Sequence, residues 1–155
     1  MINFYKPNSK NTGCAFGFRM GTQGKNNEPC VYMTSVKQYS WNEKTKNGSF
    51  SGNYKDPEKS ISVKFNETEI SGFIYAVEKY KKFNAYHTFD DNSTSIMFSP
   101  YKKKNGEDAF SFTVTRNSSN KFGIGLEISE AYLISEFFKY ALHALFSYRK
   151  NEQSK

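Results

Sequence analysis

The stretch KSISVKFNETEISGFIYAVEKY, residues 59–80, changes its hydrophobic period halfway along. Every second residue from 61 to 65 is apolar, which predicts a half-buried strand. Asn66 and Glu69 then have the spacing of a capping box, which begins a helix. The apolar residues that follow recur at helical spacing, as Ile70, Phe73, Ile74 and Val77. The stretch therefore predicts a strand that leads directly into a helix.

A second stretch, residues 121–145 with the sequence KFGIGLEISEAYLISEFFKYALHAL, has the same layout. Every second residue from 124 to 128 is apolar, and Ser129 is placed to cap a helix. Apolar residues then repeat at helical spacing, as Leu133, Phe137, Ala141 and Leu145. When Ser129 is aligned with Asn66, the alternation at 61–65 falls on that at 124–128. Agreement of strand, cap and helix together indicates an internal duplication.

Strand and turn patterns precede each of these strand–helix units. In the second half, turn-type sequences at 91–92 and 104–106 separate the predicted strands. The predicted strands are 14–20, 30–39 and 48–54 in the first half, and 85–90, 94–101 and 108–117 in the second. The simplest interpretation is a single α+β domain, residues 1–155, made of two ββββα repeats. The repeats cover about 1–83 and 84–150, and a short disordered C-terminal tail follows them.

The helices of such repeats bury their apolar faces on one side of the antiparallel sheets. The opposite strand faces are then open to solvent or to a ligand. Alternation from 110 to 116 turns Phe110, Phe112 and Val114 inward. The residues predicted to face outward are Ser60, Ser62, Lys64, Ser111, Thr113, Thr115, Lys121, Gly123 and Gly125. This open face is polar, small and basic, and it suits an extended polyanion.

The composition supports a polyanionic partner. Lys and Arg number 22 against 15 Asp and Glu, for a net charge of +7. Such an excess favours nucleic acid first and an anionic membrane surface second. Phe, Trp and Tyr make up 17% of the chain, and rings on a basic surface stack on bases. A core built of Phe in place of Leu accounts for some of these aromatic residues.

Other features narrow the class of protein. The first residues contain no apolar signal core, and no apolar run reaches membrane-spanning length. This predicts an intracellular protein, not a secreted one, whose compartment stays open. Cys14 and Cys30 are isolated, so we expect free thiols and no metal site. No cofactor motif is present, and we expect no cofactor.

Three segments resemble the Whirly family of single-stranded DNA-binding proteins. KQYSWNEK, residues 37–44, is similar to the family's Tyr-Asp-Trp segment, with Ser40 in place of the acid. NETEISGFI, residues 66–74, resembles the Thr-Glu-Ile-Gly stretch that opens the family's first helix. ISEAYLISEFFKYALHALF, residues 128–146, resembles its final helix. The likeness runs over roughly 13–146.

The resemblance implies a ββββα–ββββα protomer in a homotetramer that packs through its helices. It also implies single strands held along the outward sheets and between neighbouring protomers, with little sequence preference. NTGCAFGF, residues 11–18, keeps Gly13 and Ala15 of the family's Lys-Gly-Lys-Ala-Ala-Leu motif but lacks both lysines. Because the resemblance ties that motif to assembly and to DNA binding, this departure argues against higher-order assembly. Residues 42–58 have the character of an insertion.

Basic and aromatic residues near these strands are the candidate contacts for a nucleic acid. Alternation puts Lys37 and Tyr39 on one face, beside Trp41 and Lys44, although Trp41 also suits the edge of a sheet. The lysine run 102–104 suits either phosphate contact or a solvated loop. The full set of predicted nucleic-acid contacts is Arg19, Lys37, Tyr39, Trp41, Lys44, Lys64, Tyr86, Tyr101, Lys102, Lys103, Arg116 and Lys121.

Catalysis has little support in the sequence. His87 and His143 are the only histidines, and no nucleophile–base pair or metal-ligand spacing occurs. We therefore expect a non-enzymatic protein that binds single-stranded DNA in replication, recombination or repair. One alternative is an RNA-binding protein of the same fold, since stacking and phosphate contacts do not separate the two. Another is a structural or protein-interaction subunit whose surface aromatics form an oligomer interface.

Overall fold

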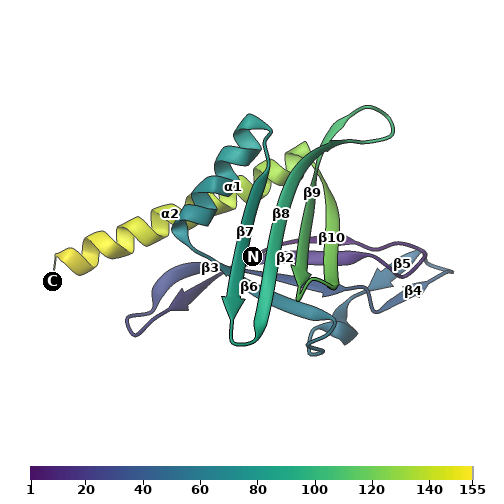
Figure 1. The fold of residues 1–155 in the computed structure, drawn as a ribbon, viewed down its shortest axis with the longest axis horizontal. Coiled ribbons are helices and arrows are strands. Elements are labelled where there is room, and N and C mark those ends of the chain that lie inside the picture. Colours follow the sequence, from purple (N-terminus) through teal and green to yellow (C-terminus); the bar gives the residue numbers. More distant parts are fainter. Residues whose placement is uncertain (155) are drawn as a thin grey trace.

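Figure 1 shows the α+β fold of the computed structural model, which describes residues 1–154. The sheet strands are β1 (Ile2–Lys6), β2 (Cys14–Gln23), β3 (Glu28–Lys37), β6 (Ser60–Phe65), β7 (Phe83–Phe89), β8 (Asn92–Lys102), β9 (Asp108–Arg116) and β10 (Asn120–Glu127). The first sheet has the order β1-β2-β3-β6 and the second the order β10-β9-β8-β7, and all neighbours are antiparallel. Helices α1 (Glu67–Lys79) and α2 (Ile128–Gln153) follow β6 and β10. The predicted α+β class, with antiparallel sheets and a C-terminal helix, is confirmed.

The first sheet takes its fourth strand from an unexpected segment. The predicted strand at 48–54 is wrong, because this segment holds only the end of the small hairpin formed by β4 (Ser40–Asn42) and β5 (Asn47–Ser49), followed by the 3-10 turn η1 (Ser51–Asn53). The fourth strand is instead β1, which pairs with β2. Phe50 packs against Ala15 and Val36, so residues 48–54 lie over the first sheet and do not join it.

The capping box predicted for the first helix is present. The Asn66 side chain accepts a hydrogen bond from the Glu69 N–H at 2.8 Å, and Glu69 Oε1 accepts one from the Asn66 N–H at 3.0 Å. These bonds satisfy two backbone groups that would otherwise lack partners at the start of a helix. Only Asn66 separates the edge strand β6 from α1, so the capping box holds the two elements close together.

The start of the second helix differs from the prediction. Ser129 is not its cap: Glu127 is the N-cap, and its N–H donates to Glu130 Oε1 at 2.9 Å. A capping box needs a glutamate or glutamine three residues after the N-cap, and Glu130 has this spacing from Glu127 and not from Ser129. Aligning Glu127 with Asn66 places the apolar positions of 61–65 on Phe122, Ile124 and Leu126, all of which are buried.

The core lies between the inner faces of the two sheets and the two helices. Phe16 and Phe18 of β2, which we interpret from sequence as core residues, are fully buried and lie 5.3 and 6.1 Å from the ring of Phe112 in β9. The sheets thus pack directly on one another, and Figure 1 shows their strands crossing. On α2, the ring of Phe138 lies 5.4 Å from that of Phe65 and 4.9 Å from that of Phe73. The last helix therefore packs against β6 of the first sheet and against α1.

The predicted alternation across the second sheet is confirmed. Phe110, Phe112 and Val114 are buried, whereas the residues that alternate with them, Ser111, Thr113 and Thr115, are partly exposed. On β10, Lys121, Gly123 and Gly125 are exposed and the apolar residues between them are buried. The outer face of the second sheet is therefore uncovered, whereas Phe50 covers part of the outer face of the first sheet, with its ring 5.8 Å from that of Tyr5.

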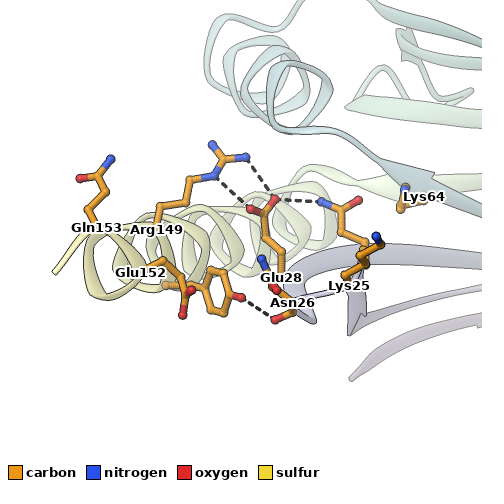
Figure 2. Close-up of a pocket in the computed structure, with 10 residues that line it drawn as sticks. Lys25, Asn26, Glu28, Lys64, Arg149, Glu152 and Gln153 are labelled. Carbon is orange, nitrogen blue, oxygen red and sulfur yellow. Dashed lines mark hydrogen bonds and ion pairs between the residues drawn. The ribbon is translucent and has the colours of Figure 1, made fainter. Parts of the chain in front are cut away.

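The last turns of α2 are fastened to the first half of the chain beside a hollow of about 650 Å³. Figure 2 shows Arg149 of α2 reaching toward Glu28 of the β2–β3 hairpin. The Arg149 guanidinium pairs with Glu28 at 3.1 Å and with Glu67, at the start of α1, at 2.7 Å. The Tyr148 hydroxyl donates to the Asn26 carbonyl. The residues around this hollow therefore hold α2 in place against the β2–β3 hairpin and the start of α1.

The Arg149 contacts predict an acid-sensitive part of the stability. The hydrogen bond from Arg149 lowers the pKa of the Glu28 carboxyl, against an opposing effect of burial. A lowered folded-state pKa adds stability above the ordinary glutamate pKa of about 4.3, and this stability is lost as the pH falls through the folded value. We expect Arg149→Met to lower the urea midpoint at pH 7 and to differ less from the parent protein at pH 3.

Lys150→Met is the matched control, because Lys150 is exposed and forms no ion pair within the described residues. Its urea midpoint should follow that of the parent at both pH values. A difference between Arg149→Met and the parent that stays constant from pH 7 to pH 3 contradicts the assignment to Glu28.

Candidate nucleic-acid interface

Three lysines from separate segments meet in a pocket of about 420 Å³, which we call the lysine pocket. Lys37 ends β3, Lys59 immediately precedes β6, and Lys121 lies in β10 of the second sheet. The Lys37 N–H donates to the Lys59 carbonyl at 2.9 Å, which extends the β3–β6 pairing to the rim of the pocket. The exposed ring of Tyr39 also lines the pocket. The fold thus brings together the sequence-predicted contacts Lys37, Tyr39 and Lys121.

The charge in the lysine pocket is of one sign. No Asp or Glu of the described chain lines it, and neither Lys59 nor Lys121 has an ion-pair partner in that part of the chain. Lys37 donates to Asn120 Oδ1 at 2.6 Å and lies 5.0 Å from the centroid of the Phe122 ring, so its ammonium is positioned but not neutralised. Burial raises the pKa of the Cys14 thiol in the pocket wall, which keeps that group uncharged. The pocket therefore suits an anion.

Hydrogen bonds make the wall of the lysine pocket rigid. The buried Gln38 side chain accepts from the N–H groups of Asn8 and Gly13, at 2.9 and 3.1 Å. Its amide nitrogen donates to the carbonyls of Asn8 and Ser40 at 3.0 and 3.2 Å. Asn53 donates to the Lys37 carbonyl at 2.9 Å, which joins η1 to the end of β3. The site is thus preformed in the free protein.

A shallow surface continues from the lysine pocket along β9 and β10, and we call it the glycine trough. Lys121 belongs to both surfaces. The floor of the trough is formed by the cross-strand pairs Thr113–Gly123 and Ser111–Gly125. Tyr101 of β8 lies across its far end, where a Cβ on Gly125 would come within 2.9 Å of the tyrosine hydroxyl. Glycine at 125 therefore lets the ring lie against the sheet, and no carboxylate of the described residues lines the trough.

The outer face of the second sheet also connects the lysine pocket with Tyr86. The strand register places Lys121, Thr115, Ser95 and Tyr86 in one row across the four strands. Three strand spacings make this row about 14 Å long. Tyr86 is 66% exposed at the end of the row, so its ring is available for stacking.

A cleft of about 690 Å³ lies beyond Tyr86, between the two sheets, and we call it the inter-sheet cleft. Lys64 and Tyr32 line it from the first sheet, and Tyr86 and Arg116 from the second. Arg19 of β2 lies next to this surface, with its guanidinium 4.6 Å from the centroid of the Tyr32 ring. The fold thus groups Arg19, Lys64, Tyr86 and Arg116 at a second place, apart from the lysine pocket.

The remaining predicted contacts lie elsewhere. Lys102, the last residue of β8, pairs with Asp108 at 2.6 Å. Lys103, in the loop that joins β8 to β9, pairs with Glu127 at 3.2 Å. Trp41 of β4 donates its indole N–H to Glu43 at 2.8 Å, and Lys44 follows in the turn of the same hairpin. None of these side chains lines the lysine pocket, the glycine trough or the inter-sheet cleft.

Two contacts in these sites are absent from the sequence prediction. Lys59 faces the lysine pocket because the β3–β6 pairing sets it opposite Lys37, and that pairing was not inferred from the chain. Tyr32 follows the same alternation as Thr34, so the period of β3 was an available signal for its outward position. The hydrophobic pattern of a single segment does not show which distant strand it pairs with, and Lys59 was missed for that reason.

No family model, curated protein or solved structure matches this chain. Neither helix of the described residues is long and apolar enough to cross a membrane. Residues 1–154 also contain no group of three or more His, Cys, Asp or Glu side chains arranged to hold a metal ion.

Proposed function

We propose that the protein binds single-stranded DNA, without catalysing a reaction on it, along the lysine pocket and the glycine trough. One observation carries this proposal: three lysines and two tyrosines line a continuous, preformed surface that has no carboxylate among its described residues. Phosphates are held by the lysines with release of counterions, and bases stack on the rings. Both kinds of contact are indifferent to base identity, so little sequence preference is expected.

The small side chains of the trough support the same proposal. Gly123 and Gly125 lack side chains that would hold a ligand away from β10, and Ser111 and Thr113 offer hydroxyl groups on β9. A single strand exposes its bases to the rings that line this surface, whereas a duplex keeps its bases paired and stacked inside. A single-stranded ligand is therefore favoured over a double-stranded one.

We also propose that the two halves of the chain are repeats with the Whirly ββββα arrangement. Each half has four sheet strands followed by a helix, and both helices begin with a glutamate at the third helical position that accepts from the cap N–H. The buried residues Ile70, Phe73 and Val77 of α1 correspond to the buried Ala131, Ile134 and Phe138 of α2 when Asn66 is aligned with Glu127. This agreement extends the repeat from the strand into the helix.

An assembly of several copies, with a tetramer favoured, belongs to the same proposal. Leu133 and Tyr140 of α2 are 50% and 63% exposed, and they share a face of the helix with the partly exposed Phe137. An apolar row of this kind suits packing against another copy. Protection of exposed strands in replication, recombination or repair is the cellular role that this binding supports.

Competition among single-stranded DNA, single-stranded RNA and duplex DNA of one length, at 50 and 200 mM salt, tests the proposal. We expect single-stranded DNA to bind most tightly. Its affinity should fall at the higher salt concentration, because lysines that neutralise phosphates release counterions from the DNA. Light scattering on the same samples gives the mass of the protein alone and of the complex. Tighter RNA binding favours the RNA-binding alternative, and absent or salt-insensitive binding overturns the proposal in favour of a structural subunit.

A further inference from the structure

We propose that the inter-sheet cleft is a separate site for a single nucleotide that carries a terminal phosphate, either a free nucleoside monophosphate or the phosphorylated end of a strand. The cleft has a volume of about 690 Å³, within the range of about 300–1,000 Å³ that is typical of small-molecule sites. Its walls come from both sheets and from the start of α1, so it is formed by elements that the core holds together.

The phosphate end of this site is carried by Lys64 and Arg116. They reach the cleft from β6 and from the end of β9, and neither forms an ion pair within the described residues. The Nε atom of Arg116 is buried and has no hydrogen-bond partner in this part of the chain. The N–H groups of an arginine guanidinium form a donor fork that suits phosphate oxygens well.

The base end is carried by aromatic rings at the mouth of the cleft. Phe89, at the end of β7, is 78% exposed, and Tyr86 on the same strand is 66% exposed. The exposed Phe89 ring lines the same cleft as Lys64 and Arg116, and its apolar surface is exposed to water when no ligand is bound. Tyr32 lines the opposite wall from the first sheet. A nucleobase supplies the flat apolar surface that fits among these rings.

The one carboxylate that lines the cleft, Glu69, is already engaged. Its Oε1 accepts from the Asn66 N–H in the capping box at 3.0 Å, and its Oε2 lies 2.6 Å from His87 Nε2. His87, Thr94 and Arg116 are neighbours in the strand register, so the histidine separates this acid from the arginine on the second sheet. The phosphate therefore belongs at the Lys64 and Arg116 side, away from Glu69.

Calorimetric titration with dAMP, deoxyadenosine and inorganic phosphate tests this site in the full chain. We expect dAMP to bind, and deoxyadenosine to bind at least about tenfold more weakly, because it lacks the charged group that Arg116 holds. Arg116→Gln should weaken dAMP binding by a similar factor and leave the affinity for deoxyadenosine unchanged. Phe89→Ala should weaken both ligands several-fold. Circular dichroism and the thermal midpoint establish that each variant is folded.

Lys82→Gln is the matched control, because it removes one positive charge from an exposed side chain that lines none of the three surfaces, and it should leave dAMP binding unchanged. Absence of dAMP binding, or dAMP binding unaffected by both Arg116→Gln and Phe89→Ala, overturns the inference. Oligonucleotide binding without dAMP binding leaves the proposed function intact, whereas the reverse result removes that function and keeps this site.

Displacement of dAMP by a 5′-phosphorylated oligonucleotide, but not by an unphosphorylated one, identifies a strand end as the source of the ligand. Absence of this displacement identifies a free nucleotide, and either result supports the site.

Discussion

A triple variant, Lys37→Gln with Lys59→Gln and Lys121→Gln, is expected to lose about 100-fold or more of its affinity for a single-stranded oligonucleotide at 50 mM salt. Each phosphate neutralised on a single strand contributes about 0.7 to the slope of log affinity against log salt. Removal of three lysines should therefore make the slope shallower by about 2. Fluorescence anisotropy between 50 and 400 mM salt measures both quantities, and the loss should shrink as the salt concentration rises.

Lysines 102–104, at the end of β8 and in the loop that follows it, provide a control with the same change in net charge. Lys102 and Lys103 already face carboxylates, at 2.6 Å from Asp108 and 3.2 Å from Glu127, so they have less charge available for phosphates. Their replacement by glutamine should leave the salt slope within about 0.7 of the parent value, which is less than one full phosphate contact. Equal losses in the two triple variants mean that net charge, and not the lysine pocket, governs binding.

Phe73→Ala is expected to destabilise the protein by about 3–5 kcal/mol, a large share of the about 5–15 kcal/mol that holds a typical domain folded. Phe73 of α1 is fully buried, and its ring lies 4.4 Å from that of Phe98 and 4.9 Å from that of Phe138. It also contacts Phe112 at 5.7 Å, so it joins α1 to the second sheet and to α2. Truncation leaves a cavity that none of these rings fills without moving.

Urea denaturation followed by circular dichroism measures this effect, with Phe89→Ala as the control. Phe89 is the same residue type but is 78% exposed, so its truncation should change the free energy of unfolding by no more than about 0.5 kcal/mol. A loss below about 1 kcal/mol for Phe73→Ala means that the rings around it close the gap, and contradicts the close packing described for this cluster.

The change of period at 59–80 was enough to predict β6, α1 and the capping box between them. The information is local there, because alternation, cap and helical repeat all lie within one short segment. The same reasoning predicted which residues of 110–116 and of 121–125 face outward. It missed β1, because Ile2–Lys6 has only two clear inward positions and its pairing partner is distant in the chain.

The candidate site was less accessible to sequence reasoning. Lys37, Tyr39 and Lys121 were selected for their types, but their meeting in one pocket depends on how the two sheets pack on one another. Lys59 was missed for the same reason, since only the β3–β6 register sets it beside Lys37. The ion pairs of Lys102 and Lys103 likewise depend on side-chain geometry that a charge run does not express.

The position of α2 has a consequence for synthesis of the chain on the ribosome. Phe138 packs against Phe18 and Phe65, and Arg149 pairs with Glu28, so the helix that follows all the other elements completes the interior of the first half. A growing polypeptide that has emerged only as far as β10 exposes those phenylalanines to solvent. Chaperone binding during translation, ending when α2 emerges, is the expected fate of this protein.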